Sequence, residues 1–227
     1  MPVWRAILIV YPELDVRIGR PRFHHVATKK EIADAAESFR AFPDLAAQLT
    51  DGAARVEVHE TRSGAALRSL SPHGKDGFWP SPDDTRRELD AFAPSGTHDS
   101  IFVFWPQHDF AAKESVPGHA WGLGMGASDW TNGATYAVVA NAPTTSWTRE
   151  SPGEVWLHEW LHGVCHHFAG QGHIMPERDA DGAEVHGYVR SETAGWTDYY
   201  RDLMSGNVRE GKRRLGIPAA AWNQDLA

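Results

Sequence analysis

Four stretches of apolar residues predict β-strands. Residues 3–11, VWRAILIVY, are rich in branched and aromatic side chains and stop at Pro12, which predicts a buried first strand. Residues 55–60, RVEVHE, alternate apolar with polar positions and predict a half-exposed strand. Residues 100–105, SIFVFW, form a continuous apolar run typical of a central strand, and residues 134–140, ATYAVVA, predict a further strand.

Between these strands, apolar residues recur at helical spacing and predict helices. Thr28 and Glu31 have the spacing of a capping box, and the helical period then continues to a break at Pro43, after which a further helical stretch follows. Residues 81–82, Ser-Pro, predict the start of another helix. The order strand, helix, strand, helix, strand predicts an α/β fold with a mixed sheet, right-handed crossovers and at least some parallel strands.

Two segments rich in glycine are expected to lie outside these elements. Residues 63–82 are crowded with Gly, Pro and Ser and are expected to form a loop. Residues 118–128, GHAWGLGMGAS, miss the dinucleotide fingerprint because Ala127 stands where the third glycine belongs, and no helical pattern follows. A flexible connection into the next strand is therefore favoured over a phosphate loop.

Residues 151–170, SPGEVWLHEWLHGVCHHFAG, predict a helix with one buried face. Ser151, Pro152 and Glu154 combine an N-cap, a proline at the first helical position and a capping-box acid. An apolar stripe at i, i+4, i+7 and i+11 is expected to pack against the sheet. Its members are Leu157, Leu161, Val164 and Phe168.

Composition and charge restrict the class of protein. The 227 residues are 41% hydrophobic, with no run near the roughly 20 apolar residues of a membrane span. We expect one domain over residues 1–227, with a sheet-bearing lobe in residues 1–172 and a smaller, mainly helical lobe in residues 173–227. The net charge of −8 without a long basic run argues against nucleic acid as a partner. The sequence leaves the oligomeric state open.

The first residues and the cysteine content bear on the compartment. Arg5 is followed by an apolar stretch of only about five residues, so the three-part pattern of a secretory leader is missing. Cys165 is the only cysteine, so no internal disulfide can form, and the residue is expected to fill core space. We expect a cytoplasmic location, although secretion stays open.

The stretch HEWLH carries the candidate chemistry. At about 100° per residue, His158 and His162 lie roughly 40° apart on one side of the predicted helix, so both imidazoles can bind one ion. Glu159 projects beside the pair, where a carboxylate can take a proton from water and pass it to a leaving amine. The alternative is a helix whose two histidines and acid are only structural, in an α/β protein without metal.

The form H158-E159-W160-L161-H162 resembles the HExxH motif of the zincin metallopeptidases. The resemblance implies that His158 and His162 bind Zn²⁺, that Glu159 is the general base, and that the reaction is hydrolysis of peptide bonds in a peptide or protein substrate. It also implies that the strand at residues 134–140 lies along the cleft and pairs with the substrate. A non-catalytic zincin-like binding module and a zinc-dependent small-molecule amidase are the alternatives.

The third zinc ligand is open from the sequence alone. His166 is too far along the helix to share an ion with His158, and Phe168 stands where the metzincin form requires a histidine. Residues 176–189 suggest a second helix, where Glu184 has a separation from His162 similar to that of the gluzincin third ligand.

The alternatives to Glu184 are His186, Asp181 and His173. Tyr188, one helical turn after Glu184, is a candidate donor to the oxyanion, or else a tyrosine of the core. Trp196, with residues 199–203, is expected to form a further core-facing helix without a chemical role.

Overall fold

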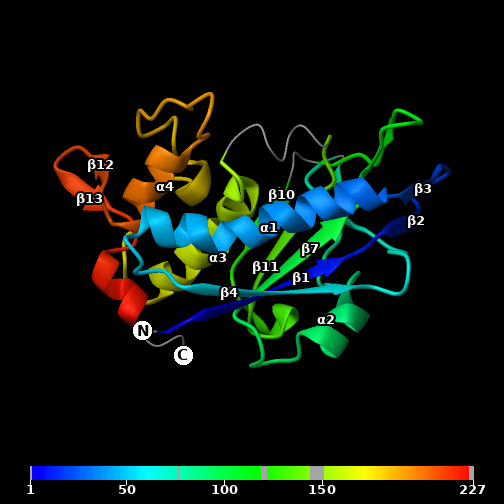
Figure 1. The fold of residues 1–227 in the computed structure, drawn as a ribbon, viewed down its shortest axis with the longest axis horizontal. Coiled ribbons are helices and arrows are strands. Elements are labelled where there is room, and N and C mark those ends of the chain that lie inside the picture. The colour runs from blue at the N-terminus through cyan, green and yellow to red at the C-terminus, as the bar shows by residue number, and fades with distance from the viewer. Residues whose placement is uncertain (1, 76, 119–121, 144–150, 225–227) are drawn as a thin grey trace.

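The computed structural model describes residues 2–75, 77–118, 122–143 and 151–224. A five-stranded sheet lies at its centre, in the order β10-β11-β7-β1-β4 (Figure 1). Its strands are β1 (Trp4–Val10), β4 (Val56–Arg62), β7 (Ser100–Trp105), β10 (Gly122–Met125) and β11 (Thr135–Ala140). All neighbouring pairs are parallel except β10 with β11, which is antiparallel. The predicted mixed sheet with parallel strands is confirmed.

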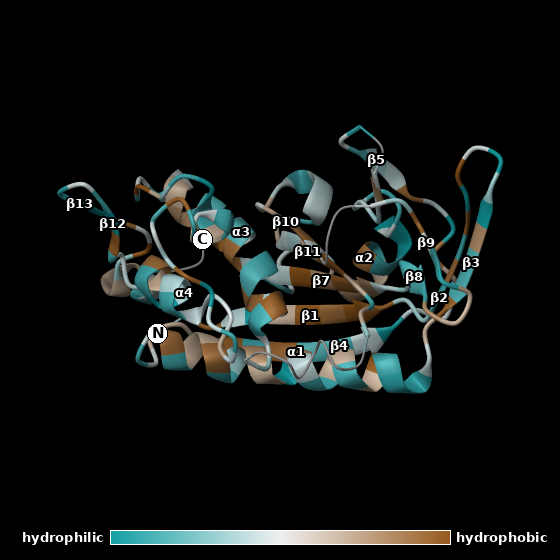
Figure 2. Cartoon of the chain, turned by 90° about the horizontal axis from the view of Figure 1, so that it is seen from above, coloured by the Kyte–Doolittle hydropathy of each residue, from teal (hydrophilic) through white to brown (hydrophobic). Residues whose placement is uncertain are grey.

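Each face of this sheet is covered by a separate hydrophobic core. In β7, Phe102 and Phe104 face one core, whereas Ile101 and Val103 face the other. The first core contains the helices α1 (Lys29–Leu49), α3 (Glu154–Gly170) and α4 (Thr197–Met204). The second contains α2 (Arg86–Phe92) and the hairpin of β2 (Glu13–Arg17) and β3 (Arg22–Val26). Figure 2 shows the apolar colour concentrated on the central strands between these layers.

Helix α1 begins at the predicted capping box but does not break at Pro43. The Thr28 hydroxyl accepts from the Glu31 N–H, and the Glu31 carboxylate accepts from the Thr28 N–H. A proline inside a helix costs about 3 kcal/mol. The apolar face continues past Pro43 and buries Leu45, Ala46 and Leu49, which offsets that loss, so the predicted break is wrong.

Residues 63–82 and the start of α2 also differ from the prediction. The expected loop contains a short hairpin of β5 (Ser71–His73) and β6 (Gly77–Trp79). Helix α2 begins at Arg86 rather than at residues 81–82, because Ser81 belongs to a turn in which its backbone N–H donates to the Asp84 carboxylate.

The glycine-rich segment before β11 contains a strand in place of the expected flexible connection. Residues 122–125 form β10, which is an edge strand of the sheet, and β11 lies inside it between β10 and β7. The expectation that residues 134–140 line the cleft as an edge strand is therefore wrong. Residues 119–121 of this segment lie outside the described residues.

The segment after α3 contains few long elements. The second helix predicted in residues 176–189 is wrong: the 3-10 helix η3 (Asp179–Asp181) is followed by turns, with positive φ at Arg178, Asp179 and Gly187. The core-facing helix predicted at 199–203 is confirmed as α4. The remaining elements are β8 (His108–Asp109), β9 (Glu114–Ser115), η1 (Asp129–Thr131), β12 (Val208–Glu210), β13 (Arg213–Leu215) and η4 (Ala219–Asn223).

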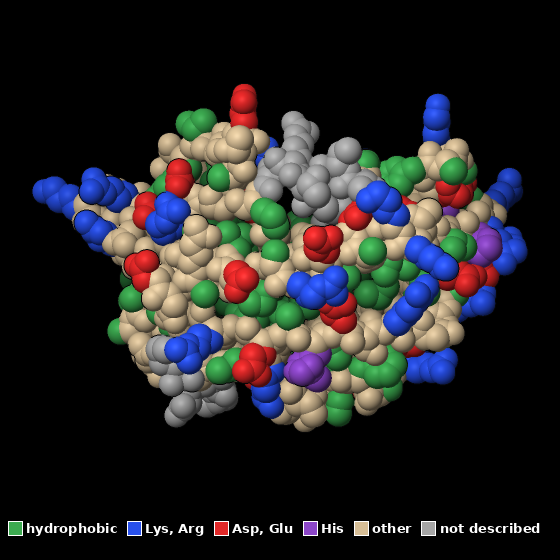
Figure 3. Space-filling view, in the orientation of Figure 1, with side chains coloured by type: hydrophobic (Ala, Val, Ile, Leu, Met, Phe, Trp, Pro, Cys, Tyr) green, Lys and Arg blue, Asp and Glu red, His purple; other side chains and the backbone are tan. Residues whose placement is uncertain are grey.

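Charged side chains are mixed over most of the face in Figure 3, but basic ones gather at the end formed by the β12–β13 hairpin. Arg209, Lys212, Arg213 and Arg214 are all exposed there. Among the described helices, we find none whose length and apolar content would let it span a lipid bilayer.

Candidate metal centre

The helix that carries the HEWLH stretch is α3, and a glycine sets its start. Its N-cap is Gly153, with φ of +89°, rather than Ser151 in a capping box. A Cβ at Gly153 would lie 2.7 Å from the backbone of Phe42, so the close packing of α3 on α1 requires glycine at this position. The predicted cap is wrong for this reason, whereas the predicted helix is confirmed. In place of the predicted capping role, the Glu154 carboxylate accepts a hydrogen bond from the Trp196 N–H, just before α4, at 2.9 Å.

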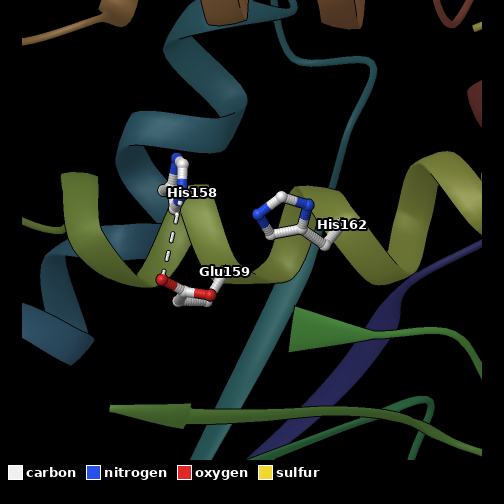
Figure 4. Close-up of side chains that lie close together, drawn as sticks. All are labelled: His158, Glu159 and His162. Carbon is white, nitrogen blue, oxygen red and sulfur yellow. Dashed lines mark ion pairs between the residues drawn. The ribbon is translucent and has the colours of Figure 1, made fainter. Parts of the chain in front are cut away.

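The predicted apolar stripe of α3 is buried, which leaves the histidines on its flank. The buried residues include Leu157, Leu161, Val164 and Phe168, together with Cys165. His158 and His162 are partly exposed one turn apart, and Glu159 is only 4% exposed. Figure 4 shows the two imidazoles on successive turns, with the Glu159 carboxylate on the side of the neighbouring strands.

The structure brings these three side chains together. Each offers a ligand atom, and these atoms lie within 4.8 Å of one another. The two imidazole centroids are 5.0 Å apart, and the His158 Nε2 lies 3.8 Å from the Glu159 Oε1. The sequence prediction that His158, Glu159 and His162 form one group is therefore confirmed as geometry.

Each imidazole has its Nδ1 atom engaged by a partner on a different segment. The His158 Nδ1 is 2.8 Å from the Tyr200 hydroxyl on α4, and the His162 Nδ1 is 2.5 Å from the Asp179 Oδ1 on η3. When Nδ1 carries the hydrogen and donates to such a partner, Nε2 keeps its lone pair for a metal ion. This arrangement is the usual support for metal-binding histidines.

A third carboxylate faces both free nitrogens. The Asp181 Oδ1 is 3.4 Å from the His158 Nε2, and its Oδ2 is 3.9 Å from the His162 Nε2. Two ligands that bind one tetrahedral zinc ion at 2.0–2.1 Å lie roughly 3.3 Å apart, so Asp181 stands close to ligand position. Its side chain is 64% exposed, which places it at the solvent side of the group.

The 3-10 helix η3 holds Asp179 and Asp181 in one turn. Arg178 and Asp179 have backbone φ angles of +64° and +37°, values that residues other than glycine rarely adopt. The Asp179 carboxylate also accepts from the Ala180 N–H, and its carbonyl oxygen accepts from the Tyr199 hydroxyl. Such backbone strain persists where surrounding contacts fix it, and here it aims both carboxylates at α3.

Burial and neighbouring charge act differently on the two imidazoles. Burial, together with the neighbouring His162, lowers the pKa of His158 to about 4, so His158 is in the neutral form that binds metal at pH 7. For His162 burial also acts to lower the pKa, but the hydrogen bond and charge of Asp179 outweigh it and raise the pKa. The same hydrogen bond lowers the pKa of Asp179, although burial opposes it.

Glu159 differs from the other acids of the group because it is buried and accepts no hydrogen bond from the described residues. Burial raises its pKa to about 8, although the nearby His162 acts in the opposite direction. Among the described residues, no group donates a hydrogen bond to its carboxylate, and its one ion-pair distance is the 3.8 Å to His158. A cation held between the imidazoles would favour the ionised form of this acid.

The other predicted site residues lie outside this group. Glu184 is exposed, and among the described residues it makes no ion pair with either imidazole. The Tyr188 hydroxyl donates to Asp202, and its ring packs edge-on against Tyr199. His186 stacks on Tyr199, and His173 packs against Phe168. His166 is exposed on α3, as a residue outside the first set of ligands would be.

The donor atoms present suit a zinc ion. Two imidazole nitrogens and a carboxylate oxygen are three typical zinc ligands, and three protein ligands leave a position open. The sequence offers Asp179 as an acid of the segment after α3 but does not indicate that it contacts the His162 Nδ1, and Tyr200 gives only the signal of a core residue. A scan against models of known protein families matches none of them to this chain, and a search of curated proteins finds no match either.

Proposed function

We propose that this protein is a zinc-dependent hydrolase that cleaves peptide bonds, as the resemblance to zincins implies. One observation supports the proposal above the others. The Nε2 atoms of His158 and His162 face one carboxylate while both Nδ1 atoms are engaged, and the buried Glu159 carboxylate beside them accepts no hydrogen bond from the described residues. Buried polar groups in a purely structural cluster are normally satisfied within the protein.

The metal ligands in this proposal are His158, His162 and Asp181. Asp181 replaces Glu184, the ligand that the gluzincin resemblance implies, because Asp181 is close to both Nε2 atoms and Glu184 is close to neither. When bound, a zinc ion would supply Lewis acidity, which lowers the pKa of water and polarises a carbonyl.

Glu159 is the general base and acid of the proposed reaction. Its carboxylate accepts a proton from the water that attacks the carbonyl carbon and then delivers that proton to the leaving amine nitrogen. We leave Tyr188 outside the mechanism because its hydroxyl is bonded to Asp202.

The edge strand β10 supports a peptide as the substrate. Among the described strands, β10 pairs only with β11, so its other edge has backbone groups available. Its residues Gly122 and Gly124 pack directly on the turn of α3 that carries Glu159. An extended peptide that added to this edge would form main-chain hydrogen bonds beside the base, which favours a peptide over a small amide.

The deciding experiment measures zinc content and peptide cleavage on the same preparations. We expect near-stoichiometric zinc in the purified protein, and cleavage within a broad mixture of synthetic peptides that stops with a chelator and returns with zinc. Glu159→Gln is expected to keep zinc and to lower cleavage by at least about 10³-fold. A zinc-loaded protein that cleaves no peptide would overturn the proposal in favour of a binding module.

A further inference from the structure

The side chains of β10 alternate between glycine and large apolar residues. Leu123 and Met125 pack against the core on the α2 side of the sheet. Gly122 and Gly124 point to the opposite side, where α3 crosses the strand, and Gly126 continues the series. Glycine within a strand marks a place where another element approaches closely. The glycines of GLGMG are therefore a contact surface for α3.

The three glycines meet different atoms of α3. A Cβ at Gly122 would lie 2.5 Å from the Cδ and Oε1 atoms of Glu159. At Gly124 it would lie 2.2 Å from the backbone oxygen of Glu159, and at Gly126 it would lie 2.3 Å from the His166 Nδ1. Thus only Gly122 faces the carboxyl group of the proposed base.

A methyl group at Gly122 would displace that carboxyl group without a change in the backbone. Gly122 is not among the residues with positive φ, so alanine can adopt its conformation. The clash is with the far end of a side chain, which can rotate away, whereas the clash at Gly124 is with backbone. The fold would therefore tolerate alanine at position 122, but the Glu159 carboxylate could not keep its place beside His158.

We propose that Gly122 is a positioning residue: the lack of a side chain there sets the location of the Glu159 carboxylate. This inference rests on the proposed role of Glu159 as the base. It assigns a function to one glycine of a segment whose composition otherwise suggests a flexible connection. The inference also predicts that alanine substitutions at Gly122 and at Gly126, two glycines of the same segment, have different effects on kcat.

The first test compares Gly122→Ala with the matched control Gly126→Ala in the zinc-loaded protein. We expect Gly122→Ala to keep its zinc and its KM for a cleaved synthetic peptide while kcat falls by roughly 100-fold, as for a misplacement of about 1 Å. Gly126→Ala should stay within about twofold of wild type, because its methyl group displaces only the exposed His166. Equal kcat values for the two variants would overturn the proposal.

The second test does not depend on cleavage, because it measures by Tm only how position 122 packs against Glu159. Gly122→Ala is expected to lower the Tm by roughly 2–4 °C in the presence of Glu159. In the Glu159→Ala background the same change should raise the Tm slightly, because the clash is gone and alanine restricts the unfolded chain. The same decrease in both backgrounds would overturn the inference. A coupling in Tm without any cleavage by wild type would instead show that only the proposed function is wrong.

Discussion

Two polar clusters on opposite faces of the sheet use their buried carboxylates in different ways. On the α2 side, Glu88 is 7% exposed, and each of its oxygens accepts a hydrogen bond: one from the Tyr11 hydroxyl at 2.7 Å and one from the Ser63 hydroxyl at 2.8 Å. On the α3 side, Glu159 is 4% exposed and accepts none from the described residues. We call these the closed cluster and the open cluster.

The difference between the clusters shows what each contributes to the protein. The closed cluster satisfies its polar atoms with protein groups, so it stabilises the fold without help. The open cluster places two imidazole Nε2 atoms and two acidic side chains around one point, and a cation there would favour the ionised form of Glu159. A buried acid without partners is thus a stronger indication of chemistry than burial or charge alone.

The largest expected effect concerns the ligand that completes the open cluster. Asp181→Asn removes the charge that faces both Nε2 atoms and should weaken zinc binding by at least roughly 100-fold, or about 3 kcal/mol. Glu184→Gln, three residues away on the same loop, should change zinc affinity by less than twofold. Competition with a fluorescent zinc chelator measures both. If Glu184→Gln had the larger effect, the gluzincin arrangement would be correct and ours wrong.

The second prediction contrasts the two buried acids in the stability of the fold. Glu88→Ala leaves the buried Tyr11 hydroxyl without its acceptor, whereas the Ser63 hydroxyl keeps the Ala65 carbonyl oxygen, and should lower the free energy of unfolding by about 2–3 kcal/mol. Glu159→Ala in metal-free protein should leave it unchanged or raise it. Urea unfolding of both variants gives the comparison, with wild type as reference. A comparable loss in both variants would show that the open cluster is also structural.

The third prediction concerns the pH dependence of the metal-free protein. The pKa of Glu159 is raised from 4.5 to about 8 by burial, so between these values the folded protein holds a proton that the unfolded chain has released. Stability contributed by that proton is therefore lost as the pH rises toward 8. Wild type should lose about 2 kcal/mol relative to Glu159→Gln between pH 6 and pH 8. Parallel pH profiles from urea unfolding would contradict this.

Local sequence patterns predict the part of the open cluster that lies on one helix. His158, Glu159 and His162 follow from helical geometry alone, because residues one turn apart lie on one side whatever surrounds the helix. The central strands follow from apolar runs, as in SIFVFW. These features depend on neighbouring residues, which is why sequence reasoning reaches them.

The rest of the cluster depends on contacts that no short pattern encodes. Asp179 and Asp181 reach α3 because Arg178 and Asp179 adopt positive φ, which the helical pattern of residues 176–189 does not indicate. Strand β10 is not predicted from the sequence because glycine has low strand propensity. The contact that requires glycine in β10 is with α3, some 35 residues later in the chain. Tyr200 has the spacing of a core residue and is one, yet its hydroxyl also contacts His158.

The smallest expected effect separates the two tyrosine hydroxyls near the open cluster. Tyr200→Phe removes the partner of the His158 Nδ1 and should weaken zinc binding by about tenfold, or roughly 1.4 kcal/mol, at the lower end for such supporting groups. Tyr188→Phe is the matched control, because its hydroxyl donates to Asp202 and not to an imidazole. Both variants keep an aromatic ring, buried at residue 200 and packed against the core at residue 188, so their unfolding free energies should be similar. Equal zinc affinities would mean that His158 is oriented by packing alone, and the open cluster would then depend on Asp179 as its single anchoring partner.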